Sequence, residues 1–226
     1  MTNIEKHYNN IFKKLDDLGE KSYLMGNGIA WAFHDDPRHV LFTLSRYKFV
    51  AKMFDGLNHV LEIGCGDGFA SRLILQQIKQ LTAIDVDHNF INNAKDRNIK
   101  DWHINFKVHD ILDDGPIESN FDGAFSLDVI EHIKKNNHEL FLKNICKSLS
   151  TSGILIIGHP SIESQPYASS QSKLGHVSCL TQKELKITLQ KHFKNVFLFS
   201  MNDEVIHTGF SKMSHYNLAL CTEKKY

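Results

Sequence analysis

The sequence predicts an α/β fold in which short apolar strands alternate with helices and end together at one edge of a sheet. The first strand covers residues 59–63 and leads into a loop with glycine at Gly64, Gly66 and Gly68. Further apolar runs follow, and most of them end in an acidic residue. Open α/β sheets bind ligands at the carboxyl ends of their strands, so the pattern indicates a ligand site beside the glycine loop.

A helical lead-in, residues 1–56, precedes the first strand, and residues 57–226 form the predicted ligand-binding domain. Apolar residues between Val40 and Phe54 recur at steps of three and four, which is typical of an amphipathic helix. The segment before it, residues 26–37, is rich in turn residues and aromatics. We expect a loop there that acts as a lid over the pocket.

After the glycine loop, the sequence predicts a helix from Phe69 to Lys79. Apolar residues from Leu140 to Leu149 predict another helix, and Gly153 suits the turn that follows it. The second to fifth strands are expected at residues 81–85, 106–111, 121–128 and 153–159.

Beyond the fifth strand, residues 160–170 are polar and show no periodicity, and long irregular insertions of this kind are usually functional. Thr181 followed by Glu184 is a capping box, which predicts the start of a helix. Two last strands are expected at Asn195–Met201 and Tyr216–Thr222.

Composition limits the class of protein. The charges balance, with 26 basic and 26 acidic residues, so we expect no nucleic-acid partner. The four cysteines lack C-x-x-C spacing and are expected to be reduced thiols. The N-terminus lacks the features of a signal peptide, and no apolar run reaches the length of a membrane span. We therefore expect a cytoplasmic protein that does not bind a membrane.

The glycine loop itself distinguishes two kinds of ligand. A nicotinamide-binding loop requires a third glycine at the position of Phe69. With Glu62 ahead of the glycines, the pattern is E-x-G-x-G-x-G, which resembles motif I of the class I S-adenosylmethionine-dependent methyltransferases. The resemblance covers residues 40–222. It implies a Rossmann-like sheet of seven strands in the order 3-2-1-4-5-7-6, with the last strand antiparallel and helices on both faces.

The resemblance also implies the cofactor, S-adenosylmethionine, and the product S-adenosylhomocysteine. In this family the carboxylate at the position of Asp85 binds the ribose hydroxyls, and the acid at Asp110 binds the adenine. Arg46 matches an arginine that holds the methionine carboxylate in ubiquinone-pathway O-methyltransferases. A helix cap at Asp85 and a solvated surface charge at Arg46 are the alternatives. The implied cofactor-binding residues are Arg46, Glu62, Gly64, Cys65, Gly66, Asp85, Val86, Asp110, Ile111 and Leu127.

Asp128, Glu131 and His132 follow the fourth strand. The ubiquinone-pathway enzymes have a similar E-x-x-E-H segment that binds a divalent cation. Here the first acid is one methylene shorter, which weakens a three-ligand site, so we expect no metal. Metal binding by these three residues is the alternative.

Methyl transfer to a hydroxyl requires alignment and removal of a proton, and histidine suits the second task. By position at the carboxyl edge, we expect His159 or His176 to be the base, ahead of His132. Glu131 completes the catalytic candidates. His207 and His215, in the connection between the last two strands, are weaker ones.

The predicted function is O-methylation of a small polar molecule by a monomer or homodimer. The polar residues 160–170 favour a sugar, a phosphate-bearing molecule or a nucleotide-linked precursor of a surface glycan as the acceptor. N-methylation of a small amine is an alternative, and methylation of protein or RNA is another. An inactive cofactor-binding scaffold is disfavoured, because a scaffold does not require Asp85 and Asp110.

Overall fold

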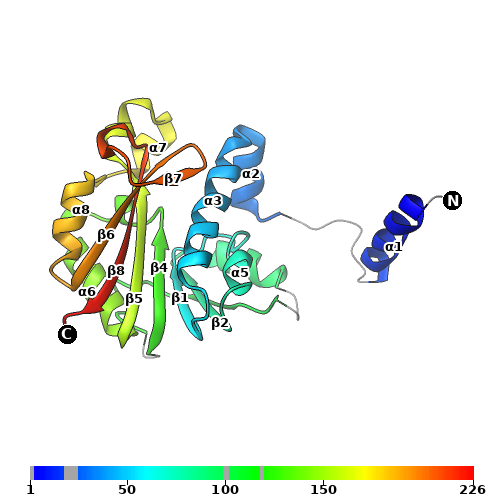
Figure 1. Cartoon of the computed structure of the whole chain (residues 1–226), viewed down its shortest axis with the longest axis horizontal. Coiled ribbons are helices and arrows are strands. Elements are labelled where there is room, and N and C mark those ends of the chain that lie inside the picture. The colour runs from blue at the N-terminus through cyan, green and yellow to red at the C-terminus, as the bar shows by residue number, and fades with distance from the viewer. Residues whose placement is uncertain (1–2, 18–24, 99–101, 118–119) are drawn as a thin grey trace.

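The computed structural model describes residues 3–17, 25–98, 102–117 and 120–226. Within these ranges the chain forms one eight-stranded sheet in the order β3-β2-β1-β4-β5-β8-β6-β7 (Figure 1). The strands are β1 (His59–Ile63), β2 (Gln80–Asp85), β3 (Asn105–Val108), β4 (Phe121–Leu127), β5 (Leu149–Pro160), β6 (Phe193–Asn202), β7 (Val205–His207) and β8 (Tyr216–Lys224).

Helices cover both faces of this sheet (Figure 1). The α-helices are α1 (Asn3–Asp17), α2 (Asn27–Asp35), α3 (Arg38–Met53), α4 (Arg72–Leu75), α5 (His88–Asp96), α6 (His138–Ser148), α7 (Ser170–Gly175) and α8 (Gln182–Leu189). Short 3₁₀ helices cover Ile130–His132, Lys135–Asn137, Ile162–Tyr167 and Ser211–Met213.

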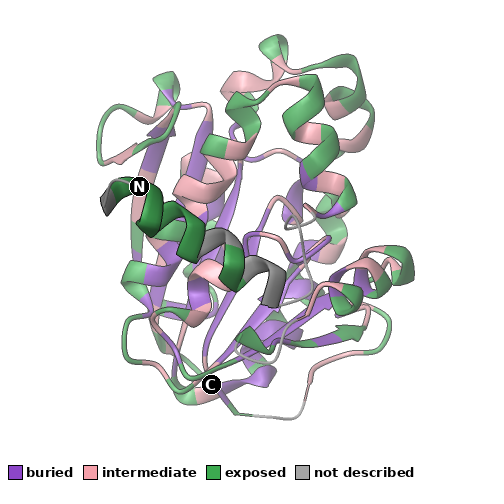
Figure 2. Cartoon of the chain, turned by 90° about the vertical axis from the view of Figure 1, so that its right-hand side faces the viewer, coloured by how far each residue is buried: buried purple, intermediate pink, exposed green. Residues whose placement is uncertain are grey.

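Side chains of the central strands alternate between two hydrophobic cores, as the pleat of a strand requires. On β1, Val60 packs with α3, α4 and α5, whereas Leu61 packs with α6 and α8. The buried residues therefore follow the strands through the middle of the molecule (Figure 2). The predicted amphipathic helix is α3, which buries Tyr47, Val50 and Phe54 against the sheet.

The predicted strand order is confirmed, with one strand more than expected. β1 to β5 are parallel to one another, and β8 is antiparallel to both β5 and β6. The extra strand is β7, which pairs with the end of β6 through Asn202 and Val205. Asp203 has a positive φ of 48°, and this conformation makes the tight turn that adds β7 to the sheet edge.

Three predicted elements differ from the structure. Residues 26–37 form the helix α2 rather than a loop. The helix expected from Phe69 to Lys79 is reduced to the four residues of α4, because turns such as Gln77 N to Ile74 O return the chain to β2 at once. Gly153 lies inside β5 rather than in a turn.

Gly153 is small for a packing reason. A Cβ there would lie 2.9 Å from the Leu149 Cβ and 3.0 Å from the Phe121 carbonyl oxygen, so only glycine lets β5 approach β4 this closely. All four cysteines are unpaired. In the described part of the chain, we find no helix with the length and apolar character needed to cross a membrane.

Candidate active site

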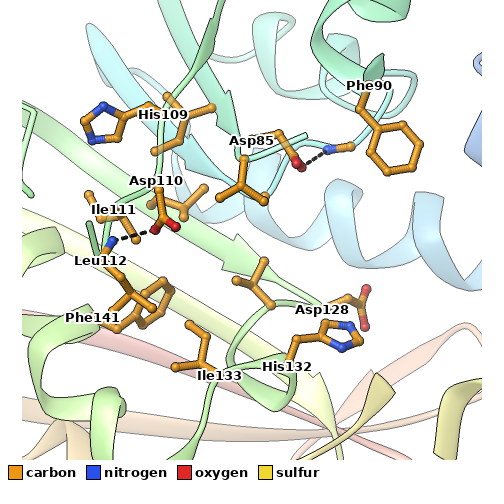
Figure 3. A pocket seen from close by; sticks show the side chains of 16 residues that line it. Asp85, Phe90, His109, Asp110, Ile111, Leu112, Asp128, His132, Ile133 and Phe141 are labelled. Atoms are coloured by element: carbon orange, nitrogen blue, oxygen red, sulfur yellow. Dashed lines mark hydrogen bonds between the residues drawn. The ribbon is translucent and has the colours of Figure 1, made fainter. Parts of the chain in front are cut away.

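A pocket of about 500 Å³ opens at the carboxyl ends of β1, β2 and β4, and the chain that leaves β3 forms one of its walls (Figure 3). Three carboxylates line it, from Asp85, Asp110 and Asp128, among apolar side chains. Its lining contains Ile63, Gly64, Gly66, Ile84, Asp85, Val86, Phe90, His109, Asp110, Ile111, Leu112, Asp128, Val129, His132, Ile133 and Phe141.

The glycine loop makes the floor of this pocket. Gly64 and Gly66 have φ values of 80° and 53°, which L side chains rarely adopt. A Cβ at Gly64 would collide with Val129, whereas a Cβ at Gly66 would meet nothing within 4 Å. Because Gly66 lines the pocket, the free space beside it is space that a ligand can fill.

Asp85 braces the loop from the end of β2. Its Oδ2 accepts a hydrogen bond from Gly66 N at 2.8 Å (Figure 3). Its Oδ1 accepts one from Asp87 N at 2.9 Å. The cap of helix α5 is Asp87, which accepts from Asn89 N, so the alternative of Asp85 as that cap is wrong. Val86, next to it, lies at the rim and is 63% exposed.

Asp110 and Ile111 form the wall opposite the glycine loop (Figure 3). The Asp110 Oδ1 accepts from Leu112 N at 2.8 Å, which fixes the carboxylate beside the pocket. Ile111 is buried, and its carbonyl oxygen accepts from Asn144 Nδ2 at 2.7 Å. An acidic group beside an apolar wall can bind one edge and one face of a planar ring.

A second hollow of about 260 Å³ adjoins the first and shares Gly64, Gly66, Phe90 and Asp128 with it. Cys65 and Leu127, both predicted cofactor residues, line this second hollow, and Ile29 of α2 closes it from the other side. The combined shape suits a ligand with a flat, bulky part in the larger pocket and a narrower arm in the smaller hollow.

Glu62 lies under the loop, outside both hollows. It is 1% exposed, and its Oε1 accepts a hydrogen bond from the Tyr47 hydroxyl at 2.6 Å. Burial raises the pKa of Glu62 from 4.5 to about 7. The pair connects α3 to β1 beneath the glycine loop.

Arg46 reaches the pocket edge from α3. Its Nη1 donates to Asp128 Oδ2 at 2.7 Å, and its guanidinium carbon lies 3.8 Å from the centre of the Tyr216 ring. Asp128 has a positive φ of 57°, which is uncommon for a residue other than glycine. The Arg46 Nε is buried without an acceptor among the described residues, so the guanidinium retains a donor for another anion.

Glu131, His132 and His176 converge beside Asp128, and one ligand atom of each lies within 4.8 Å of the others. Glu131 is wholly buried, and neither of its carboxylate oxygens has a hydrogen-bond partner in the described residues, although Oε1 lies 4.0 Å from His132 Nε2. Burial, followed by the charge of Asp128, raises the pKa of Glu131 well above its usual range. The sequence had grouped Asp128 with Glu131 and His132, but Arg46 holds Asp128 and His176 completes the cluster.

In both histidines of the cluster, one ring nitrogen lies at hydrogen-bond distance from a carbonyl oxygen. The His132 Nδ1 lies 2.9 Å from the Gly175 carbonyl oxygen, and the His176 Nδ1 lies 2.9 Å from Gln165 Oε1. A carbonyl can only accept, so each Nδ1 carries the proton and each Nε2 is left as a base. His132 lines the main pocket, whereas His176 does not.

His159, the other expected base, is fully enclosed at the end of β5. Its Nδ1 is 2.8 Å from the Pro160 carbonyl oxygen, and burial lowers its pKa to about 4. A base with so low a pKa, outside both hollows, is poorly suited to take a proton from a bound molecule near neutral pH.

Several lining residues were missed from the sequence. Phe90 faces both hollows, His109 precedes Asp110, and Tyr47 follows Arg46. The signal for His109 was its position directly before Asp110, and Phe90 lies in the first turn of the helix that follows Asp85. No sequence signal pointed to Asp67, whose carboxylate bonds to helix α2.

Residues 61–157 match the family described as a methyltransferase domain. Together with the sheet order and the glycine loop, this match confirms the resemblance: the chain has the class I S-adenosylmethionine-dependent methyltransferase fold, and S-adenosylmethionine is the cofactor of that class.

Two curated relatives show the range of this class. The chain is 29% identical over 102 residues to a ubiquinone biosynthesis O-methyltransferase of Rickettsia bellii. The alignment covers 43% of the chain and 40% of that enzyme. The chain thus matches less than half the length of this relative. It is 28% identical over 179 residues to the phosphoethanolamine N-methyltransferase of Plasmodium falciparum, covering 74% of the chain and 67% of that enzyme.

Among solved structures, the N-methyltransferase NodS from Bradyrhizobium japonicum, in complex with S-adenosylhomocysteine, aligns with a TM-score of 0.58 and 22% identity. The alignment covers 84% of this chain and 87% of NodS. At this level of identity the likeness concerns the fold.

Proposed function

We propose that this protein transfers the methyl group of S-adenosylmethionine to a small polar molecule. The observation that carries the proposal is the pocket of about 500 Å³ in which Gly66, Asp85 and Asp110 meet at the carboxyl edge of the sheet. The free space at Gly66 supports it, since a Cβ there would occupy ligand space.

In this proposal, Asp85 accepts hydrogen bonds from the ribose hydroxyls, and Asp110 and Ile111 hold the adenine. The smaller hollow beside Cys65 and Leu127 takes the methionine arm, and the unused donor of Arg46 supports a contact with its carboxylate. The bound cofactor supplies an electrophilic methyl group on a sulfonium. The protein is left to align the acceptor and to remove its proton.

For the proton, the proposed base is His132, ahead of His159 and His176. His132 is the member of this set that lines the main pocket, and its Nδ1 contact with Gly175 leaves Nε2 as the basic atom. His176 and the buried Glu131 lie behind it and hold the ring in place. We also propose that the chain divides into a helical lead-in, residues 1–56, with α2 as the lid, and a cofactor-binding domain, residues 57–226.

The expected glycan precursor loses its support. That expectation rested on the hydroxyls of residues 160–170, but Ser161 Oγ donates to the Ser214 carbonyl oxygen and Ser164 Oγ to the Ser161 carbonyl oxygen. Tyr167 is 90% exposed. Because these groups serve the backbone or face solvent, we propose only a small polar acceptor.

N-methylation is the second candidate, and the acidic end of the pocket favours it. Asp128 lines the pocket, and the buried Glu131 lies beside it without a hydrogen-bond partner in the described residues. Carboxylates in these positions suit an acceptor that carries an amine. The long match to the Plasmodium N-methyltransferase supports the same candidate.

The experiment supplies S-adenosylmethionine with a labelled methyl group and a panel of small amines and small hydroxyl compounds, read by mass spectrometry. Label on an amine selects N-methylation, and label on a hydroxyl selects O-methylation. The Gly66→Val protein is the inactive control. If EDTA abolishes the transfer and Mg²⁺ restores it, the cluster of Glu131, His132 and His176 is the candidate metal site, and the expectation of transfer without a metal is wrong.

A further inference from the structure

We propose that Asp67 is a positioning residue that couples the glycine loop to helix α2, so that α2 covers the smaller hollow only while the loop keeps its present shape. The inference rests on the proposed function, because it concerns the residence of the same cofactor. Asp67 belongs to the loop but was not among the expected cofactor residues.

One carboxylate joins two distant segments. The Asp67 Oδ2 accepts a hydrogen bond from Ile29 N at 2.8 Å, and its Oδ1 accepts one from Phe69 N at 3.0 Å. Asp67 is 8% exposed, so neither bond competes freely with water. The first bond fixes α2, and the second fixes the turn after the last loop glycine.

Helix α2 needs this acceptor because it has none of its own. Its N-cap residue is Gly26, which offers no side chain to the free N–H groups of the first turn. Asp67 fills that role from another part of the chain, and its negative charge suits the positive end of a helix. An N-cap aspartate from a distant loop makes the helix start depend on that loop.

The contact between Asp67 and α2 requires that residue 26 has no side chain. A Cβ at Gly26 would collide with the Asp67 carboxylate carbon. From the opposite side, Arg97 donates to the Asp67 carbonyl oxygen, and Asn93 Oδ1 accepts from Asn27 N at 3.1 Å. The start of α2 is therefore held by the glycine loop and by α5, and both of these elements line the pocket.

The functional consequence follows from the position of the smaller hollow. Ile29 and other residues of α2 line it on one side, and loop residues from Gly64 to Phe69 line it on the other. A ligand arm in the hollow is enclosed between two walls that Asp67 ties together. Release of the ligand then requires that the Asp67 contact with Ile29 opens, or at least loosens.

The test compares Asp67→Ala, Asp67→Asn and Gly26→Ala with the wild-type protein by two measurements. Amide hydrogen exchange followed by mass spectrometry reports on residues 27–35, and stopped-flow or surface measurements give the dissociation rate of S-adenosylhomocysteine. For Asp67→Ala we expect exchange in α2 and dissociation to be faster by about tenfold, which corresponds to about 1.4 kcal/mol. Asp67→Asn keeps an acceptor oxygen and should show a smaller effect.

Gly26→Ala keeps the carboxylate but displaces it, so it should reproduce the Asp67→Ala result, and the double variant should add little to either. Thr181→Ala is the matched control. Thr181 caps α8 from the adjacent position in the chain and lies outside both hollows, so dissociation should keep its wild-type rate.

Two results would overturn the coupling. One is that Asp67→Ala keeps the wild-type rates of amide exchange in α2 and of S-adenosylhomocysteine dissociation. The other is that Thr181→Ala accelerates both rates as much as Asp67→Ala does, which would show general destabilisation. A wild-type protein that does not bind S-adenosylhomocysteine would instead contradict the proposed function. The contact between Asp67 and α2 would then still be decided by exchange in the ligand-free protein.

Discussion

Each oxygen of Asp85 accepts one backbone hydrogen bond, from Gly66 N or from Asp87 N, and keeps a second lone pair for a ligand. We expect Asp85→Ala to weaken S-adenosylhomocysteine binding by at least about tenfold, since a hydrogen bond to a charged group contributes roughly 1.5–3 kcal/mol. Asp87→Ala is the control, because Asp87 only caps α5. Equal affinity of wild-type and Asp85→Ala protein in calorimetry would show that Asp85 does not contact the ribose.

His132 provides a second prediction at the residue scale. If it removes the acceptor proton, His132→Ala should lower the turnover rate by about 10²–10⁴-fold while S-adenosylhomocysteine affinity stays close to wild type. Added imidazole should restore part of the rate. His159→Ala should change the rate far less, because His159 is enclosed. A larger loss in His159→Ala than in His132→Ala would reverse the assignment.

Glu62 should make stability depend on pH. Its pKa is raised by burial from 4.5 to about 7, so between these values the folded state binds more protons than the unfolded state. The free energy of unfolding therefore increases as the pH falls from about 7 towards 4.5, and it decreases as the pH rises over the same range. Glu62→Gln removes this term and keeps an acceptor for Tyr47.

We expect the wild-type protein to lose up to about 3 kcal/mol relative to Glu62→Gln between about pH 5 and pH 8. Urea denaturation without cofactor measures it. Other titrating groups, such as the buried His159, are present in both proteins and cancel. Parallel pH profiles for the two proteins would show that Glu62 stays charged when buried.

At the scale of elements, substitutions of two glycines distinguish the loss of ligand space from the effect of backbone strain. Gly66 and Gly56 both have positive φ, and a Cβ at either would meet nothing within 4 Å. Only Gly66 lines the pocket. We expect Gly66→Val and Gly56→Val each to lower stability by about 1–2 kcal/mol, whereas only Gly66→Val abolishes S-adenosylhomocysteine binding.

Circular dichroism and calorimetry on the two valine variants decide this. If Gly66→Val kept wild-type affinity, the loop would be only a turn between β1 and α4. If both variants lost binding, the loss would come from unfolding rather than from occupied ligand space.

All strands except β7 were predictable because each contains apolar residues in a short run, and this pattern is local. The helices that were predicted wrongly depend on contacts between residues that are distant in the sequence. Residues 26–37 read as a loop because Gly26 cannot cap α2, and the actual acceptor, Asp67, comes from the glycine loop. The helix expected from Phe69 was too long because β2 must begin close to β1.

For the molecule as a whole, the sequence predicted a ligand site at the carboxyl edge, and most of the predicted cofactor residues line the two hollows there, since they follow strands in a fixed order. It placed His159 and His176 ahead of His132, although His132 is the one of the three that lines the main pocket. The reason is that position at a strand end does not reveal burial. His159 ends β5 but is enclosed, while His132 lies on a short 3₁₀ helix that faces the pocket. The strand β7 was missed because three residues carry no periodic signal.

The central claim is that the two adjoining hollows bind S-adenosylmethionine. Calorimetric titration of the wild-type protein with S-adenosylhomocysteine tests it most directly, with NADH as the comparison because its loop would need glycine at Phe69. We predict saturable binding of S-adenosylhomocysteine at a single site and no binding of NADH. Absence of S-adenosylhomocysteine binding, or tighter binding of NADH, would contradict the claim.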